Sequence, residues 1–342
     1  MLEPGLHLLI PVLLAVMLAI VMGGSGTGPS FSVAYGAGII KRSTIPLLFG
    51  LMVFLGAAIA GKATGQTLGK EILPAEMMNY KVVTIILFSV FLALLIANLT
   101  GIPQSTSQAT VFSVTAVSIY YGVFNSNKLF FEIIPTWFIL PVFSFLLCFL
   151  IGRFLYKPLR KTGISYAKKF NKSHWLKGAI LILALYVAFS IGSNNVANAV
   201  GPLTSMLYNE NGMQQSYDKD KIMLATVFLT APFFGLGSVL FGKKILHNTG
   251  KEIVLLGKFE ALIIAFVSGS LLLLASLYKG IPTSLVQLNV GAILGIGVSK
   301  MGFACIFKKT QVNRFFIIWI LAPLIAFVCT LLLLLFFDYI GL

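Results

Sequence analysis

Long apolar runs alternate along this chain with segments of intermediate polarity. The apolar runs cover residues 6–22, 45–60, 82–99, 131–151, 178–191, 221–241, 253–277 and 314–338. An α-helix needs about 20 residues to cross the hydrocarbon core of a bilayer, and most of these runs approach that length. The pattern predicts an all-α polytopic membrane protein, with room for roughly ten membrane segments.

Four segments between these runs are rich in Gly, Ser and Thr, and they cover residues 23–40, 101–122, 192–207 and 280–299. They are too polar for helices that face lipid and too apolar for loops. Polar, non-helical backbone survives at membrane depth only where protein buries it or where it lines an aqueous cavity. We therefore expect interrupted helices there, and above all a break within residues 192–201, facing a hydrated solute site.

Three sequence blocks occur twice, in the same order, in the two halves of the chain. They are GSGTGPS at 24 and GSNNVAN at 192, GKATGQTLGKEIL at 61 and GKKILHNTGKEIV at 242, and NLTGIPQST at 98 and LYKGIPTSL at 277. This repetition predicts an internal duplication, with a first repeat at 1–151, a linker at 152–177 and a second repeat at 178–342. Short or interrupted segments at matching positions of two repeats indicate the binding site of a transporter.

Composition and charge agree with a membrane protein. The chain has 342 residues, of which 58% are hydrophobic and 10% charged, whereas about a quarter of the residues of a soluble domain are charged. The net charge of +15 would suit a nucleic-acid-binding protein, but basic patches interleaved with aromatic residues on a soluble face are missing from the sequence. Eight Lys or Arg residues and no Asp or Glu lie between Arg153 and Lys177. The positive-inside rule then places the linker in the cytoplasm and the protein in the plasma membrane.

The repeated blocks resemble the inorganic phosphate transporter family, whose members carry a GANDVANA-type motif and a GxPxSTTH-type motif in each half. The second half keeps most of the first motif, with Asn195 where the family has aspartate. In the first half, Gly26 and Thr27 occupy the Asn-Asp pair. Gln108 and Gln287 stand at the histidine positions of the second motif. The resemblance implies an anion carrier with two inverted repeats, discontinuous helices and two re-entrant hairpins around a central site, acting as a homodimer.

Helix N-termini are suited to hold an oxyanion, because they offer free N–H groups and about half a positive charge each. Pro103 and Pro282 fit the first turns of two such helices, where a missing N–H costs nothing. The expected substrate-binding residues are Thr27, Ser30, Ser105, Thr106, Ser107, Asn194, Asn195, Asn198 and Ser284, with Ser25, Gln108 and Gln287 as further candidates. Helix–helix contacts by the hydroxyls, helix capping by the asparagines and satisfied buried glutamine amides are the alternative explanations.

The replacement of both motif aspartates affects which anion the site is expected to bind. Hydrogen phosphate carries a proton and needs an acceptor, whereas sulfate carries none at pH 7 and is satisfied by donors alone. A carboxylate would also repel a dianion. Thr27 and Asn195 leave an uncharged cage rich in donors, which favours sulfate, and the chain looks most like the sulfate permeases within the family. Phosphate is the alternative substrate, with Asn195 accepting its proton.

Importing a dianion against about −100 mV costs roughly 4.6 kcal/mol, so uptake needs a cotransported cation. Protons are the expected coupling ion because both motif aspartates, which would suit Na⁺, are replaced. Glu260 is the leading proton carrier, although an interfacial ion pair with Lys258 would explain it equally well. An anion channel is the alternative from another functional class. The polar breaks hold no His, Asp or Glu cluster and no nucleophile–base pair, so neither an enzyme nor a cofactor or metal is expected.

Overall fold

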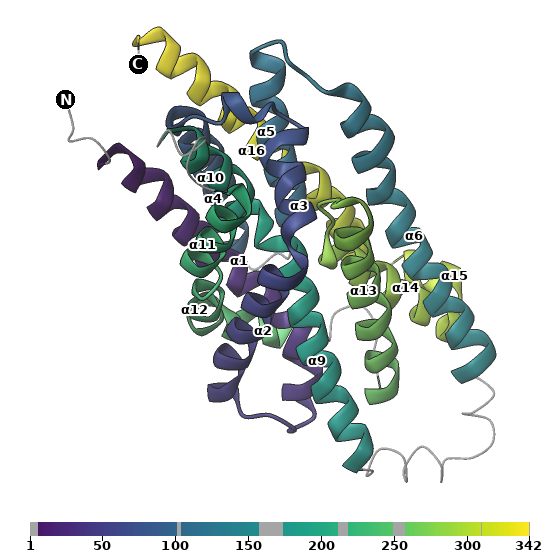
Figure 1. Ribbon diagram of the computed structural model, residues 1–342. Helices are drawn as coiled ribbons and strands as arrows, with labels where there is room; N and C mark the ends of the chain where they lie inside the picture. Colours follow the sequence, from purple (N-terminus) through teal and green to yellow (C-terminus); the bar gives the residue numbers. More distant parts are fainter. Residues whose placement is uncertain are drawn as a thin grey trace.

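The computed structural model describes residues 6–100, 104–156, 174–210, 218–248, 257–308 and 310–341. Within these ranges the chain is mostly helical and contains no strand (Figure 1). The α-helices are α1 (Leu9–Gly36), α2 (Ile45–Ala60), α3 (Lys62–Gln66), α4 (Tyr80–Thr100), α5 (Thr106–Tyr120), α6 (Ile134–Leu150), α9 (His174–Asn195), α10 (Ala197–Glu210), α11 (Lys219–Thr230), α12 (Phe233–Asn248), α13 (Lys258–Lys279), α14 (Leu285–Met301), α15 (Phe303–Phe307) and α16 (Thr310–Tyr339).

Eight helical segments of the described chain are long and apolar enough to cross a membrane, and α14 is a shorter apolar helix. The prediction of an all-helical, multi-pass membrane protein is thus confirmed. The predicted run 45–60 coincides with α2. The predicted run 221–241 is divided between α11 and α12, and the division falls beside Pro232, whose missing N–H removes one helical hydrogen bond.

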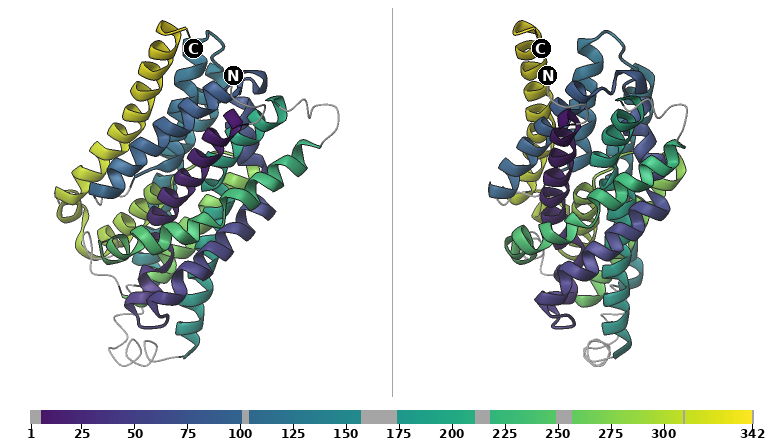
Figure 2. Two further views of the ribbon diagram at one scale, coloured as in Figure 1. Left: turned by 90° about the vertical axis from the view of Figure 1, so that its left-hand side faces the viewer. Right: turned by 60° about the vertical axis from the view of Figure 1, so that its left-hand side comes forward.

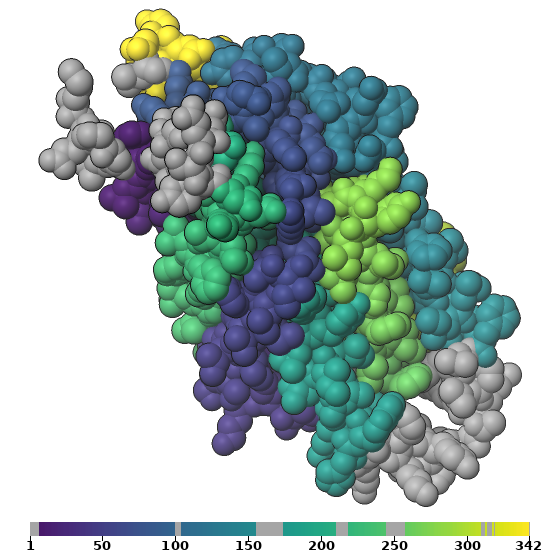
Figure 3. Space-filling view, viewed as in Figure 1, coloured from purple at the N-terminus to yellow at the C-terminus, as the bar shows by residue number. Residues whose placement is uncertain are grey.

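The helices form an elongated bundle whose two chain ends lie together. α1 begins and α16 ends at one end of the bundle, while α9 begins at the opposite end (Figures 1 and 2). On one face, α9 lies between α2 and α13 (Figure 3). Gly56 and Gly192 are needed between α2 and α9, because a Cβ at either position would lie about 2 Å from a backbone oxygen of the other helix, Phe189 O or Val53 O.

The prediction that the helix is interrupted at the first glycine-rich block, residues 24–30, is wrong. α1 is continuous through residues 23–30, and within it Thr27 Oγ1 donates to Gly23 O at 2.8 Å and Ser30 Oγ donates to Gly26 O at 3.0 Å. These hydroxyl groups are satisfied inside the helix, so they do not require a break. The glycines instead permit contact with α12: a Cβ on Gly23 would lie 2.2 Å from the backbone oxygen of Phe234.

The expected interruption of the second-half motif is confirmed. α9 ends at Asn195 and α10 begins at Ala197, so the helix is broken at Val196 in the middle of the asparagine-rich stretch. The break lies in the protein interior, because Asn194, Asn195 and Asn198 are all buried.

Two pairs of neighbouring helices return to the end of the bundle from which they started. Lys81, at the beginning of α4, and Tyr120, at the end of α5, both contact Asp338, at 2.8 and 2.6 Å. Glu260, at the beginning of α13, pairs with Lys300, at the end of α14, at 2.8 Å. At the other end of each pair, Ser105 and Ser284 are buried. Residues 101–103, which join α4 to the segment before α5, lie outside the described residues.

Candidate functional site

Serine residues cap the N-termini of α5 and α14. Ser105 Oγ accepts a hydrogen bond from the backbone N–H of Gln108 at 3.2 Å, and Ser284 Oγ accepts one from that of Gln287 at 3.3 Å. Pro282 was expected in the first turn of a helix, but it precedes the cap Ser284 by two residues. The helix starts after Ser284 because the serine hydroxyl accepts from the N–H of Gln287, the third residue of α14. Pro103 lies outside the described residues.

The two capped helix ends meet inside the protein. Gln287 Nε2 donates to Gln108 Oε1 at 3.1 Å, and the two residues are 179 positions apart, the same spacing that separates their sequence blocks. Both side chains are buried. Two helix N-termini, each with free N–H groups and a partial positive charge, therefore share one small volume.

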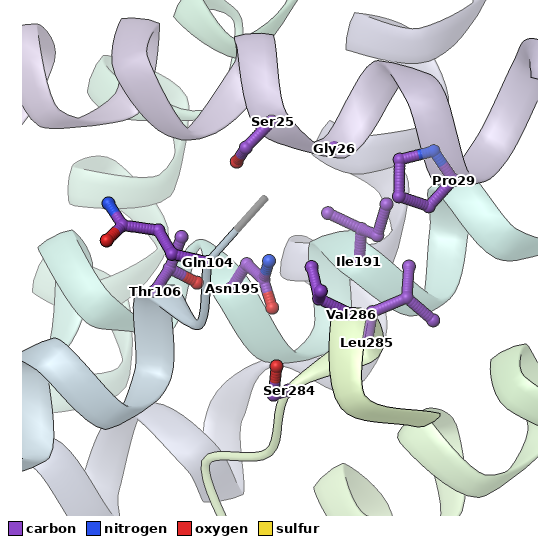
Figure 4. A pocket seen from close by; sticks show the side chains of 10 residues that line it. All are labelled: Ser25, Gly26, Pro29, Gln104, Thr106, Ile191, Asn195, Ser284, Leu285 and Val286. Carbon is purple, nitrogen blue, oxygen red and sulfur yellow. The ribbon is translucent and has the colours of Figure 1, made fainter. Parts of the chain in front are cut away.

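A small cavity lies between these helix ends, α1 and the end of α9 (Figure 4). Its volume of about 10 Å³ is room for one water-sized group, so a larger solute requires the walls to move apart. Asn195 is part of its wall, and the side chains of Asn195, Thr106 and Ser284 point toward one another. None of the described residues around it is charged; they are Ser25, Gly26, Pro29, Gln104, Thr106, Ile191, Asn195, Ser284, Leu285 and Val286.

Sequence reasoning predicted four of the polar residues around this cavity and missed one. Ser25, Thr106, Asn195 and Ser284 were predicted, whereas Gln104 was not. Gln104 Nε2 donates to Ala93 O at 3.2 Å, and its Oε1 has no hydrogen-bond partner in the described structure. Its place inside the repeated GIPxS block was the signal that could have identified it.

Asn194 lies behind the cavity and holds the inner end of the α13–α14 pair. Its Nδ2 donates to Ser276 Oγ at 2.8 Å and to Ile281 O at 3.1 Å. Its Oδ1 accepts from the backbone N–H of Thr283 at 2.9 Å and from Ser107 Oγ at 3.3 Å. All of its hydrogen-bonding capacity is thus used by protein groups, and Asn194 positions the helix ends.

Asn198 and Ser107 belong to the same supporting layer. Asn198 Nδ2 donates to Asn195 O at 3.0 Å and lies 3.4 Å from the hydroxyl oxygens of Thr106 and Ser107. Thr27 and Ser30, by contrast, are buried outside the cavity wall, and their hydroxyls bond within α1. The fold thus brings the predicted asparagines together with the predicted hydroxyls of α5. Thr27 and Ser30 of α1 do not join them.

Several buried amide oxygens near the cavity have no donor among the described residues, namely Oδ1 of Asn195, Oδ1 of Asn198, Oε1 of Gln104 and Oε1 of Gln287. A buried carbonyl oxygen without a donor is costly, so each marks a place where a solute or water can supply one. An amide also presents an NH₂ group when it rotates, so the same residues can donate to an anion.

Glu260 lies at the outer end of α13 and is not part of the cavity wall. Its side chain is completely buried, and Oε2 accepts from the backbone N–H of Gly257 at 2.7 Å. Its partner is Lys300 rather than the Lys258 considered from the sequence. The pair fastens the outer ends of α13 and α14 to each other.

Trp137 of α6 contacts the segment that precedes the N-terminus of α14. Its indole N–H donates to Pro282 O at 2.7 Å, and its ring stacks on Phe112 of α5 with ring centroids 6.1 Å apart. Trp137 therefore bridges the segment before Ser284 and α5, one layer behind the cavity.

Residues 22–330 match the model of the phosphate transporter family. The sulfate permease CysP of Bacillus subtilis is 33% identical over 317 residues, which cover 92% of this chain and 84% of that protein. A provisionally named phosphate permease of Methanocaldococcus jannaschii is 26% identical, with 93% of each chain covered. A solved structure of a sodium-dependent phosphate transporter superposes with a TM-score of 0.80 at 21% identity, covering 98% of this chain and 99% of that one, which shows a shared fold.

Proposed function

We propose that this chain, which belongs to the phosphate transporter family, imports sulfate across the plasma membrane by alternating access. The observation that carries the proposal is the cavity between the N-termini of α5 and α14, whose described walls offer hydroxyls, amides and helix ends but no carboxylate. Such walls suit a dianion that brings no proton. A relative at 33% identity that is named a sulfate permease adds support.

Alternating access is supported by the small size of the cavity and by the relation of the two halves. A cavity of about 10 Å³ is closed to a tetrahedral anion, so transport requires movement and not an open pore as in a channel. The contact of Gln108 with Gln287, which hold matching positions in the repeated blocks, agrees with inverted repeats at 1–151 and 178–342. The α4–α5 and α13–α14 pairs then act as re-entrant hairpins. The basic linker 152–177 is cytoplasmic in this proposal, and the homodimer implied by the resemblance is retained in it.

Phosphate is the second candidate, because of the unpaired amide oxygens. Oδ1 of Asn195 and Oε1 of Gln104 could accept the proton of hydrogen phosphate, a role that a sulfate ion does not require. Relatives named as phosphate permeases point in the same direction.

Proton coupling is the remaining part of the proposal, and Glu260 is its candidate carrier. A dianion entering against about −100 mV needs roughly 4.6 kcal/mol from a cotransported cation. Protonation of Glu260 would remove the charge that binds Lys300 and would release the outer ends of α13 and α14 from each other. The carboxylate would thus couple through the movement of the helix pair, not through contact with the anion.

Uptake of labelled sulfate and phosphate into proteoliposomes, under an imposed pH or Na⁺ gradient, tests all three parts. We expect saturable sulfate uptake that an inward proton gradient stimulates and that excess phosphate inhibits weakly. Glu260→Gln should bind sulfate but lose the stimulation by the pH gradient, whereas Lys177→Gln, an exposed charge at the start of α9, should keep it. Phosphate uptake that excess sulfate does not inhibit would overturn the choice of anion, and stimulation by Na⁺ alone would overturn proton coupling.

A further inference from the structure

Four charged side chains form a cluster where α6 begins, and none of them lines the central cavity. Lys128 Nζ lies 2.8 Å from Glu71 Oε2 and 2.9 Å from Glu132 Oε2. Lys279 Nζ lies 3.9 Å from Glu132 Oε2. The side chain of Lys128 is 13% exposed, whereas that of Lys279 is 49% exposed. An exposed pair at this distance contributes little stability, so the contact of Glu132 with Lys279 opens at low cost.

The cluster connects three segments that are distant in the sequence. Its members lie in the helical turn Thr67–Glu71, in the segment Lys128–Ile133 directly before α6, and at the last residue of α13, Lys279. The first two segments belong to the first half of the chain and α13 belongs to the second. The pair of Glu132 with Lys279 therefore joins the two halves.

The two halves also touch at Gly280, the residue after Lys279. Gly280 has a φ of +60°, and a Cβ there would lie 2.4 Å from the backbone oxygen of Ala63 in α3. The hydroxyl of Thr67 lies 3.4 Å from that oxygen and 3.1 Å from Glu71 Oε2. These contacts close a ring that runs from Gly280 through α3 and the charged cluster back to Lys279. The segment 280–284, which leads from α13 to α14, is thus anchored to the first half at its beginning.

The same segment ends at the central cavity, because Ser284 and Leu285 are part of the cavity wall. A cavity of about 10 Å³ admits a tetrahedral anion only when its wall moves. Since only residues 280–283 separate Lys279 from Ser284, such a movement also displaces Lys279 from Glu132. Opening of the cavity and opening of the ion pair are therefore expected to occur together.

The position of the cluster along α6 indicates which side of the membrane it faces. Segment Lys128–Phe154 is long and apolar enough to cross the membrane, so the cluster at its beginning and the linker 152–177 at its end lie on opposite faces. The linker is cytoplasmic in the proposed function, and the inference rests on that proposal. We propose that the ion pair of Glu132 with Lys279 is the outer gate of the transport site. Lys128 is a positioning residue, because it holds Glu132 within reach of Lys279.

Cross-linking across the pair tests the gate. Glu132→Cys and Lys279→Cys are combined in a chain whose three cysteines are replaced by alanine, and they are joined by a short, reducible bis-methanethiosulfonate. We expect cross-linking to lower sulfate uptake into proteoliposomes roughly tenfold and reduction to restore it, because the linked segment cannot move. Sulfate uptake that survives complete cross-linking would overturn the gate. Failure of the two cysteines to cross-link would overturn it as well.

The matched control joins Glu132→Cys to Thr136→Cys with the same reagent. Thr136 lies one helical turn beyond Glu132, and its hydroxyl donates to Glu132 O, so this link leaves the segment 280–284 unattached. Uptake by the cross-linked and the reduced control should agree within about twofold. An equal loss in the control would overturn the proposal, because modification of position 132 alone would then stop transport.

Accessibility of the cavity gives a second readout, which does not require transport. Ser284→Cys, in the same cysteine-free chain, is labelled by a membrane-impermeant maleimide added outside intact cells. Lys279→Gln should raise the labelling rate roughly fivefold, whereas Lys70→Gln, an exposed neighbour of Glu71, should leave it unchanged. Lys128→Gln should raise the rate by a smaller factor, and Lys128→Arg should restore it.

The labelling outcomes separate the gate from the transport function on which it rests. Equal labelling rates in Lys279→Gln and Lys70→Gln would overturn the gate, and labelling from the cytoplasmic side only would overturn its outer placement. Absence of sulfate uptake by the wild type would instead overturn the proposed function, while the labelling rates would still show whether Glu132 and Lys279 close the cavity.

Discussion

The two matched glycine-rich blocks, at 24–30 and 192–198, have the same frame and different helical structures. In α1, the hydroxyls of Thr27 and Ser30 bond to carbonyls of their own helix, and the helix remains continuous. At the end of α9, Asn195 and its neighbours lie at a break and reach the central cavity. Hydroxyls can satisfy themselves one turn back in a helix, whereas the longer amides reach other segments. Two matched blocks can therefore differ in structure while both line the cavity: the first stays helical and contributes Ser25, Gly26 and Pro29, and the second breaks and contributes Asn195.

The largest expected effect concerns the contact of α1 with α12. Gly23→Ala would place a Cβ 2.2 Å from the backbone oxygen of Phe234, which cannot move without shifting α12. We expect a loss of about 3 kcal/mol of unfolding free energy, measured as a lower unfolding midpoint in detergent. Gly36→Ala, at the end of the same helix, meets nothing within 4 Å and should change the midpoint little. Equal midpoints for the two variants would contradict the close contact of α1 with α12.

The next effect concerns Asn195, at the break between α9 and α10. Asn195→Ala removes an amide from the wall of the cavity, and losing one hydrogen bond to a charged solute costs about 2 kcal/mol, which corresponds to roughly a thirtyfold loss of uptake. Thr27→Ala, at the matching position of α1, should retain at least half of the uptake, because its hydroxyl is bound to Gly23 O. Both variants should unfold at the wild-type temperature. A similar loss of uptake in both would mean that the two copies contribute equally to binding.

A smaller effect should follow from restoring a carboxylate to one copy only. Asn195→Asp places a negative charge in a cavity whose described walls carry none, so sulfate affinity should fall about tenfold through repulsion of the dianion. Phosphate should be affected less, because the carboxylate accepts its proton. Competition between the two anions in the uptake assay gives the ratio of sulfate affinity to phosphate affinity. If this ratio is the same in Asn195→Asp and in the wild type, selectivity is determined elsewhere.

The sequence predicted those features that depend on neighbouring residues. The extent of α2, the break beside Asn195 and the serines at the starts of α5 and α14 follow from local patterns of polarity and capping. The continuity of α1 did not follow, because the glycines of residues 23–30 look like a break unless the carbonyl of Phe234, far along the chain, is known to lie against them. The place of Gln104 in the cavity wall and the hydrogen bond between Gln108 and Gln287 were not predicted for the same reason. Both depend on which distant segments meet in the folded protein.

The bond from Trp137 to Pro282 gives the molecule its own optical reporter. Trp137 is almost fully buried, and its indole N–H is held by a carbonyl two residues before Ser284. The chain has three tryptophans, and replacing Trp175 and Trp319 with phenylalanine leaves this one as the dominant emitter. Any displacement of the segment before α14 then breaks the indole hydrogen bond and changes the emission maximum. Arrival of an anion between the two helix ends can thus be followed in real time, without an attached dye.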